Sequence, residues 1–484
     1  METLDRKNKK LYILITAVIV FIILINIKLS GSITNVNGVI LDNNGRMALA
    51  VLVFALILWI TEALPFHITG LISMILLTLT KVGDFKEVVK LGFGNDIIVF
   101  FIGVLILSAF INKSGLGKRI SLFILSMTGN DTRKVILGFM AVGVFLSMWV
   151  TDMAVAAMLM PLAKAIVEEE KLQPLKSNFG KALLISTAWG PIIGGIGTPA
   201  GCGPNPIAVG FLKSMAGIDF SFLDWMIFGV PSAIILIFPA WLILISVFPP
   251  EIKKLSKSKN EMSDEFRALP KINKEEKVTM TIFLSTAVLW IASPVLEKWL
   301  DITIPISMPV LLTSCLFFIP GMTKTKWKEI EREISWNGII LITSGIALGM
   351  MLYDSGAAKW LSMALLGGIE NVSVFVRIFA VIIIVSFLKI AFSSNTVTAT
   401  VIIPIMIVFA MSMGMNPISI ALPAAITASL AFIMVTSTPT NVIPYSAGYF
   451  SISDLVKAGV LLTVVSSAIL AGTIYFIGTI VNIY

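Results

Sequence analysis

The chain has 484 residues, of which 57% are hydrophobic and only 13% charged, and its mean hydropathy is +0.96. A soluble domain is about one-quarter charged, so this composition excludes an ordinary soluble protein. One histidine and two cysteines offer no disulfide framework, zinc-ligand spacing or His-based catalytic constellation. The net charge of +8 comes from basic residues between apolar segments, which indicates membrane topology and not nucleic-acid binding.

Apolar segments recur along the whole chain. They include 11–29, 47–64, 97–111, 222–248 and 455–480. A membrane-spanning helix needs about 20 such residues, so the pattern predicts an all-α polytopic membrane protein with about 11 transmembrane helices. The first segment is not read as a cleaved signal peptide, because no small-residue cleavage site follows it.

Basic residues mark alternate loops. They cluster in 113–134, 253–277 and 324–332, whereas the loops near 31–45 and 362–376 contain few of them. The positive-inside rule therefore predicts a protein of the cell (plasma) membrane with a cytoplasmic N-terminus and an extracytoplasmic C-terminus.

Two halves of the chain share a series of landmarks in the same order. The offset runs from 236 (205 to 441) to 243 (151 to 394). The basic loops orient the two copies oppositely, and inverted repeats of this kind are a hallmark of secondary transporters. The matched landmarks are Asn95, Gly103 and Ser114-Gly115 against Asn337, Gly345 and Ser355-Gly356, then 151–161 against 394–404, and Asn205 against Asn441.

The repeat predicts a division of the chain into a scaffold, two repeats and a linker. The predicted parts are first scaffold spans in 1–90, with the first repeat beginning near 46; the rest of that repeat in 91–248, with a hairpin at 131–170 and a broken helix at 181–212; a cytoplasmic linker at 249–277; and the second repeat in 278–484, with a hairpin at 373–412 and a broken helix at 417–445.

The segment "SSNTVTATVIIP" (393–404) places hydroxyls and an amide inside an apolar region. We interpret it as the tip of a helical hairpin that dips into the membrane, because non-helical backbone survives there only under protein or beside a water-filled cavity. Ser394 and Asn395 are favoured helix N-caps, and a helix N-terminus with free N–H groups binds carboxylates without Arg or Lys. Oxygens of the same turn can coordinate a small cation.

Two further segments are expected to break helices in mid-span. "IGGIGTPAGCGPN" (193–205) and "TSTPTN" (436–441) are dense in Gly, Pro and hydroxyl residues, which free backbone carbonyls and amides. Two hairpin tips and two broken helices, related by the repeat, predict one central site surrounded by all four.

These residues resemble those of the divalent anion/sodium symporter family, which carries dicarboxylates, citrate and sulfate. The resemblance rests on "WITEALPFHITG" (59–70), on Ser-Asn-Thr at 394–396, on the two Pro-Asn breaks and on "NVIPYSAGYF" (441–450). It implies an elevator-type transporter that is a homodimer, with sodium as coupling ion and no other cofactor.

The resemblance also implies the positions of the ligands. A first sodium site would use Ser147, Thr151, Asp152 and Gly201, and a second Ile390, Ser393, Asn395 and Ser437, mainly through backbone carbonyls. The substrate would contact Thr151, Asp152, Cys202, Ser394, Asn395, Thr396, Thr438 and Pro439.

The sequence departs from the family pattern at three positions. The first tip reads Thr-Asp-Met in place of Ser-Asn-Thr, so Asp152 either caps its helix, strengthens a cation site or titrates. Lys389 either snorkels to water, replaces a bound sodium ion as a cation surrogate, or pairs with Asp152. Cys202 stands where the family often has a hydroxyl residue.

We therefore expect a sodium-coupled symporter of C4-dicarboxylates such as succinate, malate or fumarate. A sodium-independent dicarboxylate exchanger is the main alternative, followed by a transporter of citrate, sulfate, arsenite or another inorganic anion. An anion channel would need a continuous pore. An enzyme is not expected, because no nucleophile–base pair or metal-ligand cluster is evident in the sequence.

Overall fold

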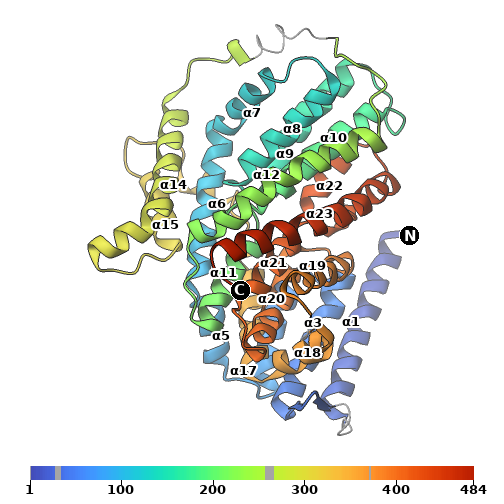
Figure 1. The fold of residues 1–484 in the computed structure, drawn as a ribbon, viewed down its shortest axis with the longest axis vertical. Coiled ribbons are helices and arrows are strands. Elements are labelled where there is room, and N and C mark those ends of the chain that lie inside the picture. The colour runs from blue at the N-terminus through green and yellow to red at the C-terminus, as the bar shows by residue number, and fades with distance from the viewer. Residues whose placement is uncertain (1, 28–33, 257–265, 370–371) are drawn as a thin grey trace.

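The computed structural model describes residues 2–27, 34–256, 266–369 and 372–484, and these are almost wholly helical apart from one short strand pair (Figure 1). The elements of the N-terminal part are α1 Glu2–Asn26, β1 Asn35–Val36, β2 Val39–Ile40, α3 Asn43–Thr61, α4 Phe66–Leu79 and α5 Phe85–Phe93. Those of the middle part are α6 Asp96–Ser114, α7 Leu116–Ser126, α8 Thr132–Ser147, α9 Asp152–Glu169, α10 Asn178–Gly195, α11 Pro204–Ala216 and α12 Phe222–Val247. The rest are α14 Lys274–Leu300, α15 Ser307–Leu316, α16 Trp327–Glu331, α17 Trp336–Asp354, α18 Ala357–Leu366, η1 Gly367–Ile369, α19 Val374–Ala391, α20 Asn395–Ser412, α21 Ile418–Ser429, η2 Val435–Ser437, α22 Pro439–Tyr445 and α23 Ile452–Ile480.

Within the described residues, nine helices are long and apolar enough to cross a membrane. They are α1, α3, α6, α12, α14, α17, α19, α20 and α23. Of these, α19 and α20 are the arms of one predicted hairpin. The other seven are fewer than the 11 or so expected from the sequence, and that total would also need shorter or broken helices such as α4, α15, α10–α11 and α21–α22, so it stays a prediction. The polytopic all-α fold is thus confirmed.

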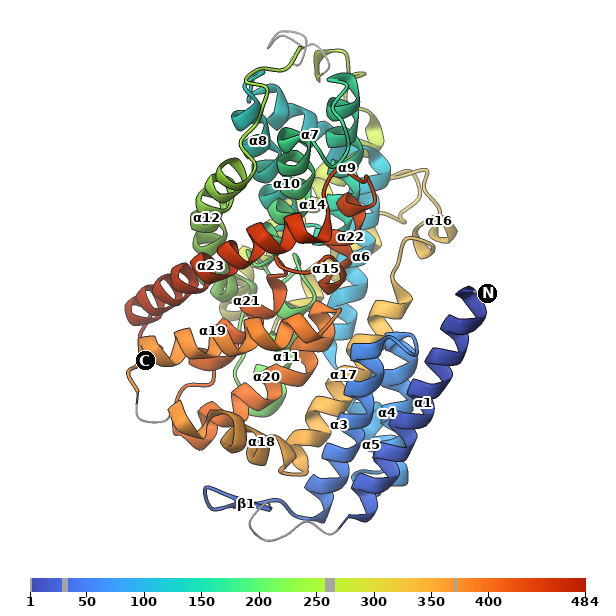
Figure 2. The same ribbon diagram turned by 90° about the vertical axis from the view of Figure 1, so that its right-hand side faces the viewer.

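The internal repeat is visible in α6 and α17. A glycine with a left-handed backbone separates each of them from the short helix that follows: Gly115 at φ 85° stands between α6 and α7, and Gly356 at φ 72° stands directly before α18. In Figure 2, α6 rises from α5 to α7, whereas α17 descends from α16 to α18. The two helices therefore run in opposite directions, as inverted repeats require.

The last long helix of each repeat begins with the same capping box. The hydroxyl of Ser221 accepts the N–H of Asp224, whose carboxylate accepts the N–H of Ser221, and Ser451 and Asp454 repeat both bonds at the start of α23. Reciprocal capping satisfies two backbone donors that would otherwise lack partners at a helix start. The repeat thus extends to the local chemistry that begins its helices.

The first hairpin is held against α10 by close backbone packing. A β-carbon built on Gly190 would lie 2.9 Å from Met140 Cα, and one on Gly194 would lie 2.3 Å from the carbonyl oxygen of Val144. Small residues at such contacts are typical of helix pairs in membranes, where close approach of the backbones supplies the attraction. Because α10 is buried along nearly its whole length, it forms the centre of this half.

The predicted linker of 249–277 lies partly outside the described residues, which lack 257–265. Its first part is attached to the hairpin base, where the Leu255 N–H donates to the Asn130 carbonyl (2.8 Å) and the Thr132 hydroxyl to the Ile252 carbonyl (2.7 Å). Its last part is pinned to α7 by Arg119, which contacts both carboxylate oxygens of Glu276 at 2.7 and 3.1 Å. The linker thus joins the first hairpin to the start of α14.

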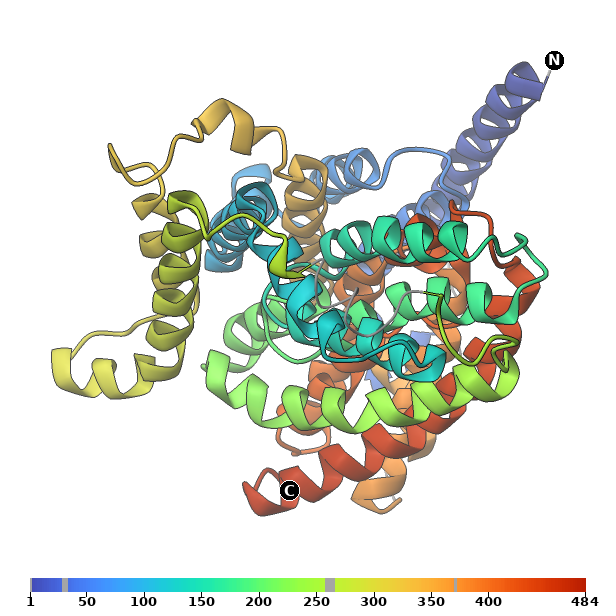
Figure 3. The same cartoon turned by 90° about the horizontal axis from the view of Figure 1, so that it is seen from above.

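The N-terminal helix α1 projects from one corner of the molecule, as the dark-blue helix in Figure 3 shows. It contacts the body through α3, where the rings of Phe21 and Phe54 meet edge to face with centroids 5.8 Å apart. Much of its apolar surface is exposed in the single chain, as expected for a helix that faces lipid.

Candidate transport site

Four interruptions of helical backbone meet in the interior. They are the tip between α8 and α9 (148–151), the tip between α19 and α20 (392–394), the break between α10 and α11 (196–203), and the break between α21 and α22 (430–438). The helices α9, α11, α20 and α22 all begin here. The positive ends of their dipoles favour an anion, although α11 and α22 begin with Pro204 and Pro439, which have no N–H to donate.

A chain of contacts joins the two tips through the first break. The Oδ2 atom of Asp152 lies 3.8 Å from the Sγ of Cys202, and that sulfur lies 3.6 Å from the Nδ2 of Asn395. The ammonium of Lys389 then donates to the Oδ1 of Asn395 and to the carbonyl of Ala428. The structure therefore brings Asp152, Cys202, Asn395 and Lys389, all buried, into one cluster.

The first break is bracketed by the side chain of Asn205. Its Nδ2 donates to the carbonyls of Gly195 and Thr198, both at 2.7 Å, so one amide closes the unwound turn. Its Oδ1 accepts the hydroxyl of Ser429 at 3.0 Å. The carbonyl of Ser429 in turn accepts the Nδ2 of Asn395 at 3.2 Å, which ties this break to the second tip.

Asn441 brackets the second break in the same way. Its Nδ2 donates to the carbonyls of Ala431 (2.7 Å) and Met434 (3.1 Å), at the spacing that Asn205 uses. In contrast, its buried Oδ1 has no hydrogen-bond partner within the described part of the chain. The two breaks therefore share the pair of bonds donated by the asparagine Nδ2, and they differ in whether the Oδ1 of that asparagine also has a partner.

Oxygen atoms gather beside the first tip. A β-carbon built on Gly201 would lie 2.4 Å from the carbonyl oxygen of Ser147 and 2.6 Å from that of Gly195, so only glycine fits between them. The Gly201 carbonyl accepts the Asp152 N–H at 3.2 Å. The buried hydroxyl of Ser147 has no partner within the described residues. Carbonyl, hydroxyl and carboxylate oxygens are ligands suited to a hard cation, so these residues fit a sodium ion.

At the second tip, Lys389, Ile390 and Ser437 line a cavity of about 20 Å³, which is room for about one water-sized species. Lys389 is only 3% exposed, so its ammonium does not reach water and the snorkelling alternative does not hold in this structure. The ammonium instead donates to the Oδ1 of Asn395 and to the carbonyl of Ala428, two oxygens that could otherwise coordinate a free cation.

The hydroxyl residues expected at the tips lie at helix starts. Thr151 is the N-cap of α9, Ser394 is the N-cap of α20 and accepts the Val397 N–H, and Ser393 is half-buried in the preceding turn. They lie next to Asp152 and Asn395 and are only partly covered, which keeps this edge of the cluster accessible.

The remaining expected contacts lie where the second tip meets the breaks. A β-carbon built on Gly203 would lie 2.8 Å from the Oγ1 of Thr396, so this hydroxyl faces the first break. Thr438 caps α22, and Pro439 is exposed in the first turn of that helix. None of the expected residues therefore lies far from the cluster.

Three participants were not expected from the sequence. The hydroxyl of Thr440 bonds the carboxylate of Asp152, while Ser429 and the carbonyl of Ala428 hold the second tip. The only available signal was the position of Thr440 beside Asn441 in "TSTPTN". Ser429 and Ala428 lie in an apolar helix and carry no local signal.

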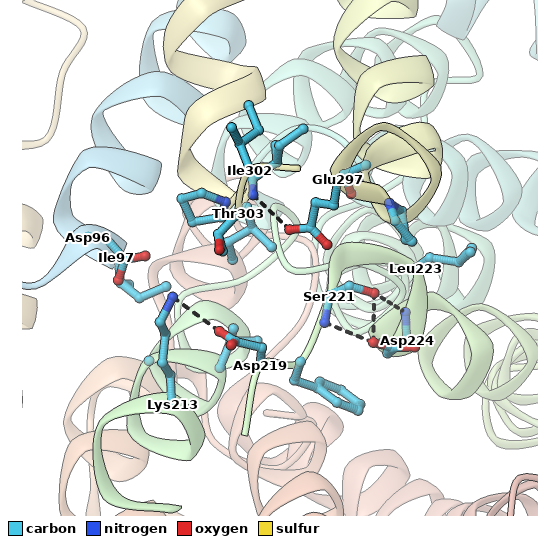
Figure 4. A pocket seen from close by; sticks show the side chains of 18 of the residues that line it. Asp96, Ile97, Lys213, Asp219, Ser221, Leu223, Asp224, Glu297, Ile302 and Thr303 are labelled. Atoms are coloured by element: carbon cyan, nitrogen blue, oxygen red, sulfur yellow. Dashed lines mark hydrogen bonds and ion pairs between the residues drawn. The ribbon is translucent and has the colours of Figure 1, made fainter. Parts of the chain in front are cut away.

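A separate cavity of about 680 Å³ lies between α11–α12, the start of α6 and the end of α14 (Figure 4). Lys213 pairs there with Asp219 at 3.1 Å, and Glu297 accepts the Ile304 N–H at 2.7 Å. Five carboxylates and one lysine line this cavity, so its charge is unfavourable for a dicarboxylate. The cluster at the tips is the better candidate for an anion site.

Comparisons with known proteins agree with this architecture. The solved structure of the YdaH transporter of Alcanivorax borkumensis superposes with a TM-score of 0.55 over 82% of this chain and 88% of that chain, at 14% identity. This chain is also 32% identical to the sodium-dependent dicarboxylate transporter SdcS of Staphylococcus saprophyticus, over 90% of this chain and 87% of that protein. It is 33% identical to SdcS of Staphylococcus aureus (strain USA300), over 90% and 86% of the two chains.

The family described as "Sodium:sulfate symporter transmembrane region" matches residues 7–483, almost the whole chain. This agrees with the resemblance noted from the tips and breaks. The protein therefore belongs to the sodium:sulfate symporter family, the divalent anion/sodium symporters.

Proposed function

We propose that the protein is a secondary transporter that couples the uptake of C4-dicarboxylates, such as succinate, malate or fumarate, to sodium. The observation that carries this proposal is the cluster in which four helix starts and two unlike tips meet around Asp152, Cys202 and Asn395. The names of the relatives at 32% and 33% identity support the same substrate and ion.

Helix starts and amides perform the recognition of the anion. The N-termini of α9 and α20 offer N–H groups to carboxylate oxygens, and Asn395 adds a side-chain donor from the second tip. The start of α11 contributes the positive end of its dipole, because Pro204 and Pro206 have no N–H. Thr396 and Thr438 supply hydroxyls, and Thr151, Ser394 and Pro439 shape the accessible edge. A dicarboxylate spans the two tips and leaves unchanged, since the protein acts as a carrier and not as an enzyme.

Sodium binds at the first tip, where the oxygens of Ser147, Asp152 and Gly201 converge and the Ser147 hydroxyl has spare capacity. Thr151 adds its backbone there. At the second tip, Ile390 and Ser437 of the expected set line a small space beside Lys389, and Asn395 accepts a hydrogen bond from the ammonium of that lysine, which already supplies positive charge there. Ser393 completes the set. Lys389 thus acts as a tethered substitute for one cation.

Transport follows an elevator mechanism. The moving unit consists of the two hairpins and the two broken helices, which lie within 91–248 and 278–484. It moves against a scaffold made of the spans of 1–90 and the first helices of the second repeat. The segment 249–277 connects the two halves. The protein works as a homodimer in the plasma membrane, as its family resemblance implies. The N-terminus is cytoplasmic and the C-terminus extracytoplasmic, because basic loops alternate along the chain.

A sodium-independent exchange of dicarboxylates is a second candidate function. The buried contacts of Lys389 with Asn395 and Ala428 favour it, since a fixed ammonium at the second tip lowers the need for a mobile cation. In that case the carrier would return across the membrane only with a substrate bound.

Labelled succinate uptake into proteoliposomes separates the two candidates. Vesicles are prepared empty or loaded with succinate, and each is assayed with an inward sodium gradient or with potassium in its place. Sodium-driven accumulation in empty vesicles is the expected result. Uptake that requires internal succinate and ignores sodium would establish exchange, and no succinate uptake in any condition would contradict both.

A further inference from the structure

The carboxylate of Asp152 faces the opposite tip with only weak donors beside it. Its Oδ1 accepts the adjacent Met153 N–H at 2.8 Å, while its Oδ2 lies 3.8 Å from the thiol of Cys202. Thr440 adds one hydroxyl. A thiol is a weak donor, so a buried carboxylate that is only 8% exposed retains acceptor capacity toward the centre of the site.

The second tip presents the opposite charge. Beyond Cys202 lie the amide of Asn395, 3.6 Å from the sulfur, and the ammonium of Lys389 bonded to its Oδ1. The site is therefore polar along one line, with a negative end at the first tip and a positive end at the second. A symmetric dianion that spans both tips places one carboxylate next to Asp152, so its binding depends on the sodium ion at the first tip to offset the repulsion between like charges.

A ligand that carries a positive group beside its carboxylates would match this arrangement of charges, because its positive group could face Asp152. We propose that the site selects dicarboxylates that carry an amino group, of which aspartate is the four-carbon member. Its ammonium donates to the Oδ2 of Asp152, and its carboxylates bind the helix starts and Asn395 on the side of Lys389. Asp152 then faces the ammonium through Oδ2, and the sodium ion at the first tip keeps the other oxygens proposed for it, those of Ser147, Thr151 and Gly201. This inference rests on the proposed dicarboxylate transport and specifies its substrate class.

Paired uptake assays test the proposal. Labelled L-aspartate and labelled succinate are supplied separately to proteoliposomes that contain the full chain, under an inward sodium gradient. The wild type is expected to prefer aspartate. Asp152→Asn is expected to lower the ratio of aspartate to succinate uptake by about tenfold or more, because a charge-assisted bond is lost and the repulsion of succinate is removed.

A matched control substitution is Asp301→Asn. Asp301 is exposed, has a left-handed backbone at φ 54° that Asn also adopts, and lies outside the tip cluster. This variant should leave the ratio unchanged. N-acetyl-aspartate, whose nitrogen is uncharged, tests the ligand side without any variant and should compete with aspartate far more weakly than unlabelled aspartate does.

The outcomes separate this inference from the proposed function. Uptake of succinate together with no uptake of, or competition by, aspartate would overturn the inference and leave dicarboxylate transport intact. An unchanged ratio in Asp152→Asn, or equal competition by N-acetyl-aspartate, would also overturn it. Failure of the wild type to carry either compound would instead contradict the proposed function.

Discussion

The first hairpin tip presents a carboxylate where the second presents an amide backed by an ammonium, although an 18-residue helix follows each tip. The backbone frame of the two tips is thus shared, whereas the charge that each adds differs. Asp152 and Lys389 carry opposite charges on opposite sides of Cys202. The repeat therefore supplies a shared geometry, and the departures from it give the two tips opposite charges.

The two breaks differ more subtly. Asn205 and Asn441 each close an unwound turn with two bonds from Nδ2, but only Asn205 also accepts a hydroxyl, from Ser429. Asn205 therefore ties the first break to the second tip, whereas Asn441 makes no equivalent bond within the described residues. This asymmetry gives the substitutions below different expected sizes.

The largest effect is expected for Asn395→Ala. This change removes the donor to the Ser429 carbonyl and one of the two acceptors of the buried Lys389 ammonium, which keeps only its bond to the Ala428 carbonyl. Succinate uptake should fall about a hundredfold or more, since the poorer solvation of a buried charge and the lost substrate contact act together. Asn26→Ala, at an exposed site on α1, is the control. Normal uptake by a folded Asn395→Ala protein would refute the site assignment.

Gly201→Ala should specifically weaken sodium dependence. The added methyl group would lie 2.4 Å from the Ser147 carbonyl oxygen and 2.6 Å from that of Gly195, so the oxygens must separate. The sodium concentration for half-maximal uptake is expected to rise about tenfold or more. Gly472→Ala is the matched control, because a β-carbon there meets nothing within 4 Å. An unaltered sodium titration in Gly201→Ala would place the ion elsewhere.

A smaller effect, on the free energy of unfolding, is expected to distinguish Asn205→Ala from Asn441→Ala. Both substitutions remove the donor to two carbonyls, but only the first also removes an acceptor of the Ser429 hydroxyl, which keeps a longer bond of 3.3 Å to the Ala425 carbonyl. Asn205→Ala is therefore expected to cost about 0.5–1.5 kcal/mol more of unfolding free energy than Asn441→Ala. Thermal unfolding of the purified proteins, followed by intrinsic fluorescence, measures the difference. Equal losses would show that the extra bond does not contribute.

The smallest effect is expected far from the tips, at Glu329. A hydrogen bond from Lys113 holds the pKa of Glu329 below its ordinary value, so the contact stabilises the fold above the ordinary carboxyl pKa and is lost as pH falls through the lowered one. Both side chains are well exposed, at 45% and 35%. Glu329→Gln should therefore change the unfolding temperature less than Asn441→Ala does, and any change should vanish in acid. A larger change than that of Asn441→Ala would be inconsistent with a solvent-screened pair.

The sequence predicted the helical bundle, the repeat and the two tips because polar residues inside apolar segments have few alternative explanations. The resemblance to the family, and not the polar pattern alone, implied that Asp152, Cys202 and Asn395 share one site. The sequence did not reveal that Lys389 bonds the Ala428 carbonyl, or that Asn205 and Asn441 bracket the breaks. Those contacts join different helices or span an unwound turn, so they depend on tertiary packing and leave no periodic pattern in the sequence.

The most direct test of the unlike tips is a sodium titration of succinate uptake in the wild type and in Lys389→Met. If the Lys389 ammonium takes the place of one cation, its removal frees Asn395 and the Ala428 carbonyl to bind sodium. The variant is then expected to require more sodium and to show a steeper, more cooperative dependence than the wild type. Superimposable sodium curves for the two proteins would contradict the account of the second tip.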